Sequence, residues 1–167
     1  MRVVKIPVKR LSAFKKCMGR IAVEGGVELK VNDESNAVID GEGGSEWIAE
    51  QVVRAIASGF DYRVASKMFN DEYYLEEVDL QLALNRNENS IKRYKARIIG
   101  TQGKAKKTIA ELSGAFLSIY GDKVFILGKF EEVRLAKEAV IRLLEGREHA
   151  GVYYFLEKSN AKSDLIG

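Results

Sequence analysis

Apolar and polar residues follow two periods along this chain, and each period predicts a different kind of element. Alternation with period two predicts strands at residues 3–8, 26–31, 37–41, 73–82, 115–120 and 123–127. Helical spacing predicts helices around residues 47–56, on both sides of residues 100–103, and at 130–145. Because strands and helices are interspersed, we expect an α+β fold.

The order of these elements repeats, which predicts two domains. Strands at 26–31 and 37–41, the helix at 47–56 and Gly59 are mirrored by residues 114–119, 124–128, the helix at 130–145 and Gly146. The offset stays at about 87 residues, as expected for a duplicated unit. We therefore predict tandem domains at residues 1–69 and 70–158, each a three-stranded sheet packed by three helices. A polar, frayed tail is expected at 159–167.

A turn between two short helices carries the strongest functional signal. Between Asn89 and Ala110 there are seven Lys or Arg and no acid, although the whole chain has a net charge of only +3. Gly100 and Gly103 lack a Cβ, so the backbone there can adopt left-handed conformations and approach a ligand closely. The amides that open the next helix favour a phosphate. A Gly-x-x-Gly pair alone is also typical of an ordinary helix C-cap.

The residues around the turn distinguish between these two interpretations. Ile98 and Ile99 precede the glycines, and Lys104 and Ile109 follow them, before a further strand. This pattern resembles the KH module, whose Gly-x-x-Gly loop clamps about four nucleotides of single-stranded RNA. The strand-helix-helix-strand-strand-helix order is similar to the eukaryotic, or type I, KH fold. The resemblance implies an RNA site formed by Arg97, Ile98, Ile99, Gly100, Thr101, Gln102, Gly103, Lys104, Lys106, Lys107 and Leu117.

The first domain lacks this motif. No Gly-x-x-Gly occurs between residues 9 and 22, and Gly25-Gly26 lies where a turn into a strand belongs. We therefore expect a degenerate KH domain without the nucleotide clamp. Residues 1–30 nevertheless carry eight positive and two negative charges. This basic segment is either a solvated face or a secondary RNA contact, whose residues would be Lys9, Arg10, Lys15, Lys16 and Arg20.

Two longer segments, at residues 108–121 and 144–157, indicate which family of KH proteins the chain resembles. They are similar to the partner-of-Nob-one, or Dim-two, family of small-subunit ribosome biogenesis proteins. The resemblance implies binding of small-subunit ribosomal RNA near its 3' end, beside the PIN-domain endonuclease that trims the precursor, with a role in processing and assembly. The absence of a long N-terminal extension is typical of the archaeal form of the family.

An excess of acids between the two basic segments suggests an alternative function. Residues 31–88 carry thirteen acids and four basic residues. Several acids flank the strand that opens the second domain, namely Asp71, Glu72, Glu76, Glu77 and Asp79. Under this alternative the protein is an adaptor whose acidic belt recruits a basic protein, with only non-specific affinity for RNA.

Enzymatic chemistry has little support in the sequence. The glycines are two residues apart rather than four, and Ala105 follows Lys104 where a Walker loop needs Ser or Thr. His149 is the only histidine and Cys17 the only cysteine, so no catalytic pair or metal-binding pattern arises. We expect no enzymatic activity, cofactor or metal. One cysteine fits a reducing cytoplasm, no apolar run reaches membrane length, and a soluble monomer is expected.

Overall fold

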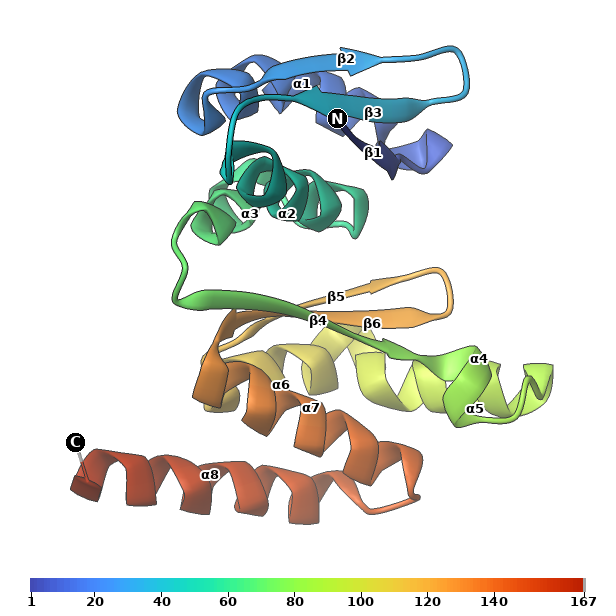
Figure 1. Cartoon of the computed structure of the whole chain (residues 1–167). Coiled ribbons are helices and arrows are strands. Elements are labelled where there is room, and N and C mark those ends of the chain that lie inside the picture. Colours follow the sequence, from blue (N-terminus) through green and yellow to red (C-terminus); the bar gives the residue numbers. More distant parts are fainter. Residues whose placement is uncertain (167) are drawn as a thin grey trace. The chain divides into compact units, whose positions relative to one another are not determined.

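The computed structural model of the chain describes residues 1–166 and the side chains of residues 1–160 (Figure 1). Contacts divide it into a first unit of residues 1–73 and a second unit that begins at Tyr74. Each unit contains one three-stranded antiparallel sheet and several helices. The predicted α+β class and the two three-stranded sheets are confirmed.

The first unit has a sheet of order β1-β3-β2, in which β3 is central. Val38 of β3 pairs with Val3 on one side and with Lys30 on the other. Helices α1 and α2 pack against each other and against the sheet. The elements are β1 (Arg2–Lys5), α1 (Val8–Gly25), β2 (Glu28–Val31), β3 (Asn36–Asp40), α2 (Ser45–Ala57), α3 (Tyr62–Ala65) and a 3-10 turn, η1 (Ser66–Phe69).

Helix α1 differs in one respect from the predicted type I pattern. That pattern has two helices between its first two strands, whereas the first unit has one helix of 18 residues. The buried residues of α1 recur at helical spacing, namely Phe14, Cys17 and Ile21. They form one continuous apolar face, whose burial stabilises the helix along its length. A single Gly19 in its middle lowers helix stability by only about 1 kcal/mol and does not end it. Gly26 ends it, with a left-handed φ of 62°, as the Gly25-Gly26 turn predicts.

The second unit has a sheet of order β4-β6-β5, so its third strand is again central. The predicted strand at 73–82 ends at Asp79, because the Asp79 carboxylate accepts the amide of Gln81 at 2.9 Å and starts a helix instead. The elements are β4 (Tyr73–Asp79), α4 (Leu80–Ala83), α5 (Glu88–Ile99), η2 (Thr101–Gly103), α6 (Lys104–Ser113), β5 (Phe116–Tyr120), β6 (Lys123–Lys129), α7 (Phe130–Leu144) and α8 (His149–Ile166).

One helix of the second unit was not anticipated. Helix α8 packs on α6 and α7, and Val152 and Leu156 are fully buried in the same core as Ile98, Ile109 and Leu143. The unit therefore has more than the three predicted helices. The segment predicted as a tail from residue 159 falls within α8 up to Ile166, and Gly167 lies outside the described residues.

Candidate nucleic-acid interface

The Gly-x-x-Gly segment forms one tight turn between α5 and α6. The Gly100 amide donates to the Ala96 carbonyl at 2.8 Å and closes α5, and the Gly103 amide donates to the Gly100 carbonyl at 3.2 Å. Gly100, Gln102 and Gly103 have φ values of 77°, 55° and 75°. Thr101 and Gln102 are exposed at the tip. The structure therefore gives the loop the shape that the sequence predicts.

The two glycines serve different purposes. A Cβ on Gly100 would lie 2.6 Å from both the Cβ and the amide nitrogen of Ala105, so α6 packs directly on the Gly100 backbone. Its φ of 77° and ψ of 172° belong to a region that is essentially reserved for glycine. A Cβ on Gly103 would meet nothing within 4 Å, and only its left-handed φ favours glycine. Gly100 therefore sets the angle between the two helices.

We predict unequal effects for the two glycine substitutions. Gly100→Ala adds backbone strain to a steric clash and should lower the free energy of unfolding by about 2–4 kcal/mol. Gly103→Ala adds only the left-handed conformation, which should lower it by about 1 kcal/mol. Urea denaturation of the two variants measures the difference. Equal losses would contradict the packing of Ala105 on Gly100.

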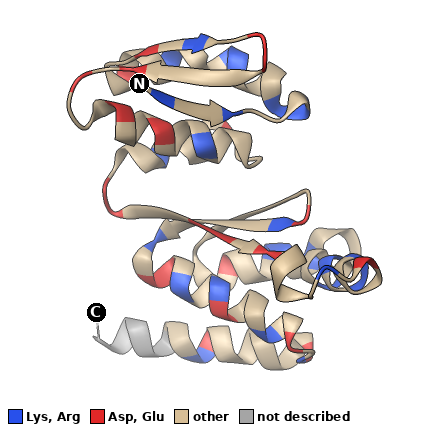
Figure 2. Cartoon of the chain, turned by 45° about the vertical axis from the view of Figure 1, so that its right-hand side comes forward, with Lys and Arg blue, Asp and Glu red and all other residues tan. Residues whose placement is uncertain are grey.

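Three lysines surround the start of α6. Lys104 and Lys107 are exposed and Lys106 is half-buried, and no carboxylate in the described part of the chain forms an ion pair with any of them. Figure 2 shows lysine and arginine residues in blue on the helices of the second unit. Helix α6 has ten residues, and its first amides point out of its N-terminus with its positive dipole end. Lysines and amides together provide a site for an anionic backbone.

Two of the predicted site residues lie in the core. Ile98 has no exposed surface and Leu117 is 7% exposed, and both belong to the core of the second unit. Their burial gives no support to a contact with a base, and their assignment to the RNA site stays a prediction. Ile99, next to the loop, is half-buried and stays in the candidate site. On a helix, neighbouring residues point about 100° apart, which explains why one isoleucine is buried and the next is accessible.

Arg97 has structural contacts that the sequence did not predict. Its guanidinium donates to the carbonyls of Leu143 at 3.0 Å and Arg147 at 2.8 Å. Its own carbonyl lies 2.8 Å from Nε2 of His149. Arg97 thus joins the end of α5 to the end of α7 and the start of α8. Sequence reasoning grouped Arg97 with the loop lysines because only its charge, and not its hydrogen-bond partners, can be read from the sequence.

Strand β5 is a part of the site that the predicted residues did not include. It lies at one edge of the described sheet, where it pairs with β6. Helix α6 packs next to it. The candidate site therefore runs from the loop over α6 to this edge.

The first unit divides its basic residues into two groups. The Arg10 guanidinium donates to the carbonyls of Ile56 and Phe60, each at 2.9 Å, and Arg20 lies 5.5 Å from the ring centroid of Tyr62. These arginines hold α1 to the rest of the unit. The lysines at positions 9, 15 and 16 are exposed and remain available for an external ligand.

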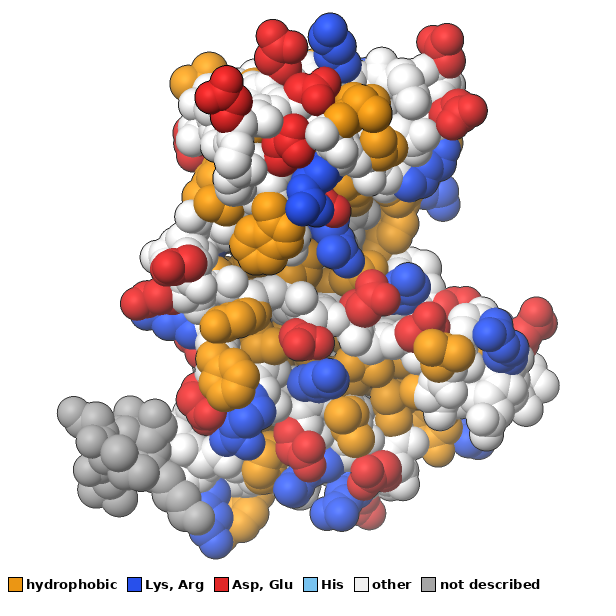
Figure 3. All heavy atoms as spheres, viewed as in Figure 1, with side chains coloured by type: hydrophobic (Ala, Val, Ile, Leu, Met, Phe, Trp, Pro, Cys, Tyr) orange, Lys and Arg blue, Asp and Glu red, His pale blue; other side chains and the backbone are white. Residues whose placement is uncertain are grey.

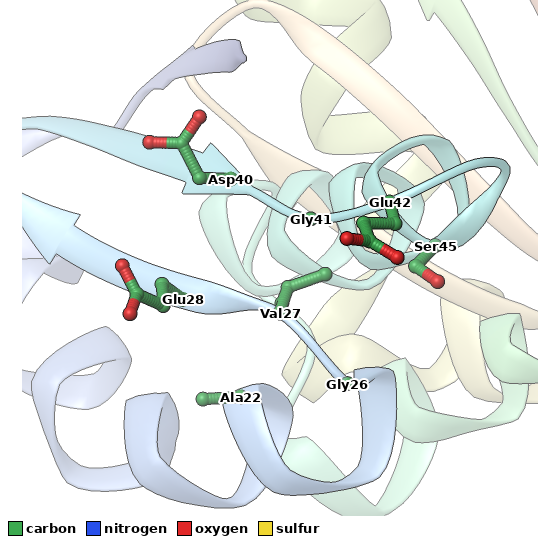
Figure 4. A pocket seen from close by; sticks show the side chains of 8 residues that line it. All are labelled: Ala22, Gly26, Val27, Glu28, Asp40, Gly41, Glu42 and Ser45. Atoms are coloured by element: carbon green, nitrogen blue, oxygen red, sulfur yellow. The ribbon is translucent and has the colours of Figure 1, made fainter.

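A hollow of about 770 Å³ in the first unit is unsuited to phosphate (Figure 4). It lies where α1 ends and the β3–α2 connection begins. The carboxylates of Glu28, Asp40 and Glu42 line it, and none of its lining residues is lysine or arginine. Negative charge there repels nucleic acid, so the lysines of α1 are the better candidates for RNA contact in this unit.

The surroundings of the side chains considered for catalysis do not favour chemical reactivity. Burial raises the pKa of the Cys17 thiol, which makes it a poor nucleophile. Within the described residues, no group of three or more His, Cys, Asp or Glu side chains is arranged to hold a metal ion. Across the same part of the chain, no helix is both long and apolar enough to span a membrane.

Comparison with known protein families decides which family this fold represents. A family model for the eukaryotic type KH-domain (KH-domain type I), representing the second KH domain of PNO1, matches residues 74–161. The chain belongs to the PNO1/Dim2 family of KH-domain proteins. The match includes the whole helix-loop-helix segment and most of α8, and it confirms the resemblance predicted from the sequence.

Individual members of the family extend the similarity to both units. A KH domain-containing protein of Methanocaldococcus jannaschii is 38% identical, and the alignment covers 97% of this chain and 75% of that protein. The pre-rRNA-processing protein PNO1 of Coccidioides immitis is 28% identical over 91% of this chain and 64% of its own length. The chain thus spans less than two thirds of this fungal relative.

Solved structures show the same arrangement. Dim2p of Pyrococcus horikoshii has a TM-score of 0.84 at 29% identity, over 94% of this chain and 98% of that one. A chain in the complex of a/eIF2alpha, aDim2p and rRNA from the same organism has a TM-score of 0.87 at 27% identity, over 96% and 94% of the two chains. Members of the PNO1/Dim2 family therefore share this fold over nearly the whole chain.

Proposed function

We propose that this protein binds single-stranded small-subunit ribosomal RNA near its 3' end and assists its processing and the assembly of the subunit. The observation that carries the proposal is the loop at Gly100–Gly103, with its left-handed glycines and three lysines that have no carboxylate partner among the described side chains. Two relatives support it, because one is a pre-rRNA-processing protein and another occurs in a complex with rRNA.

The loop and the helix after it hold the RNA backbone. Phosphates lie against the Gly100 and Gly103 backbone, where no side chain blocks their approach. The first amides of α6 and Lys104 neutralise them, and Lys106 and Lys107 attract the strand from further away. Bases lie along Ile99 and the edge of β5.

Binding measurements on two RNAs test this function. Fluorescence anisotropy with a ten-nucleotide RNA from the 3' end of the small-subunit rRNA should show tighter binding than with an unrelated RNA of equal length. The preference should persist as salt rises, because base contacts add to the phosphate contacts. Equal affinity for both RNAs, lost together at high salt, would overturn the proposal.

We also infer that the first unit is a KH domain that lacks the clamp, so that residues 1–69 and 70–158 are tandem copies. The sheet orders β1-β3-β2 and β4-β6-β5 are the same when each unit is counted from its own first strand. The continuous α1 stands where the second unit has two helices and the glycine loop. A helix cannot wrap a phosphate as the loop does, since its interior amides are already bonded.

The exposed lysines of α1 extend the RNA path under this proposal. Replacing Lys9, Lys15 and Lys16 by alanine should lower RNA affinity about fivefold and reduce the slope of log affinity against log salt by about 2, or about 0.7 for each lost phosphate contact. A control that replaces Lys30, Lys137 and Lys158 removes the same charge elsewhere. If both triple variants show the same slope, α1 is an ordinary solvated face.

Partners of the RNA-bound protein follow from the same proposal. The PIN-domain endonuclease and the precursor subunit are expected to be its neighbours, and the protein itself is expected to act as a cytoplasmic monomer. The adaptor alternative receives less support. Glu76 and Glu77 of β4 each lie 3.5 Å from a lysine, Lys137 and Lys123 respectively. Figure 3 shows both charges interspersed over this face of the second unit, so the acids do not form a uniform negative surface.

A further inference from the structure

A second hollow in the RNA-binding unit is separate from the glycine loop. It has a volume of about 280 Å³ and lies between α4, α5 and the turn that joins β5 to β6. Its lining is polar apart from Ile91, whose side chain is almost fully buried at 4% exposed. The lining residues are Gln81, Glu88, Ile91, Lys92, Lys95 and Asp122.

Hydrogen bonds fix the shape of this hollow. The Leu80 amide donates to the Asp122 carbonyl at 2.9 Å, which ties α4 to the β5–β6 turn. The Gln81 side-chain amide donates to the Asp122 carboxylate at 2.8 Å, and Nζ of Lys95 lies 3.8 Å from the other carboxylate oxygen. Side chains from three separate elements are thus held in one arrangement before a ligand arrives, which lowers the entropy lost on binding.

The hollow lies within reach of a strand held by the loop. Lys95 and Lys92 precede Gly100 by five and eight residues on α5. With a rise of 1.5 Å per residue, they lie about 8 and 12 Å from the loop along the helix axis. Stacked nucleotides rise about 3.4 Å each along one strand, so this distance corresponds to about two to four nucleotides.

The chemistry of the lining suits a nucleoside better than a bare anion. Two lysines are balanced by Glu88 and Asp122, so the hollow has no net positive charge to hold an isolated phosphate. The Gln81 carbonyl and the Asp122 carboxylate keep free lone pairs, and the two ammonium groups keep free donors. Donors and acceptors side by side match the edge of a base.

We propose that this hollow is an additional nucleotide subsite, which binds one base of the RNA strand beyond the nucleotides clamped by the Gly100–Gly103 loop. The inference rests on the proposed RNA-binding function. Lys92, which is exposed, lies at the rim and contacts the phosphate of the same nucleotide. RNA that reaches the hollow gains these contacts, and RNA confined to the loop does not.

A length series of RNA tests the subsite. The probes are the ten-nucleotide RNA from the small-subunit 3' end and truncations from either end down to four nucleotides. We expect wild-type affinity to rise about tenfold once the strand reaches the hollow, which equals one base contact of about 1.4 kcal/mol. The variant Gln81→Met, Lys92→Met should lose this rise and keep wild-type affinity for the shortest RNA that still binds.

Controls separate this inference from the proposed function. Lys137→Met removes a lysine on α7 that pairs with Glu76 at 3.5 Å, outside the hollow, and should keep the length dependence. Thermal melts show whether each variant is folded, and Lys95→Met provides an independent test if the double variant unfolds. A rise that survives in the hollow variants, or that is absent in the wild type, overturns the subsite while RNA binding stands. No preference of the wild type for any rRNA probe overturns both proposals.

Discussion

Replacing Thr101 and Gln102 by aspartate should lower the affinity for small-subunit 3' RNA by about 100-fold or more, which corresponds to about 3 kcal/mol. Both side chains are exposed at the tip of the loop, where the RNA phosphates are proposed to lie. Two carboxylates there repel phosphate and compete for the amides that open α6. Aspartate is among the residues that best tolerate the left-handed φ of 55° at position 102.

Alanine at the same two positions is the matched control. Alanine removes the same side chains without adding charge, so affinity should fall less than about fivefold if backbone amides hold the phosphates. Anisotropy titrations measure binding, and circular dichroism verifies that both variants are folded. A folded aspartate variant that still binds the RNA as tightly as the wild type would show that the loop is not the RNA site.

Leu156→Ala should produce the largest loss of stability, about 2–5 kcal/mol. Leu156 lies in α8, has no exposed surface, and packs into the core of the second unit. Its truncation leaves a cavity among side chains that cannot fully collapse. Tyr154→Ala on the same helix is the matched control, because Tyr154 is 63% exposed and its loss should cost less than about 1 kcal/mol. Urea denaturation gives both values.

Comparable losses for Leu156→Ala and Tyr154→Ala would mean that α8 does not share the core of the second unit. The same two variants also test whether α8 supports the helix that precedes the glycine loop. The His149 ring at the start of α8 lies 2.8 Å from the carbonyl of Arg97, which is three residues before Gly100. We therefore expect that loss of α8 packing destabilises the end of α5 as well as the core.

The strands of the second unit and the glycine loop could be predicted from the sequence because their signals are local. Alternation of apolar residues marks β5 and β6, and the Gly-x-x-Gly spacing marks the turn. Ile98 lies seven residues after Ile91, on the same side of α5, so helical spacing already predicted that Ile98 faces the core, while Ile99 lies off that side. The partners of Arg97 are about 50 residues away along the chain, and no local pattern points to them.

Helices were harder to predict than strands. In α1 the buried residues Phe14, Cys17 and Ile21 were visible, but the expectation of two helices came from the fold pattern and not from any break in the sequence. In α8, Val152 and Leu156 belong to an uninterrupted run of apolar and aromatic residues at 152–156, so no helical period stands out. Its helical state depends on the surface that α6 and α7 provide, which illustrates how tertiary packing outweighs local propensity.

The contrast between α1 and the α5-loop-α6 segment has an evolutionary consequence. Both segments connect the first and second strands of sheets with the same order, yet one is continuous and the other is interrupted by four residues. The interruption depends on Gly100 and Gly103, which lie outside the core cluster. A lineage can therefore gain or lose a binding loop by changes at these two glycines, of which Gly100 also contributes to folding because α6 packs on it.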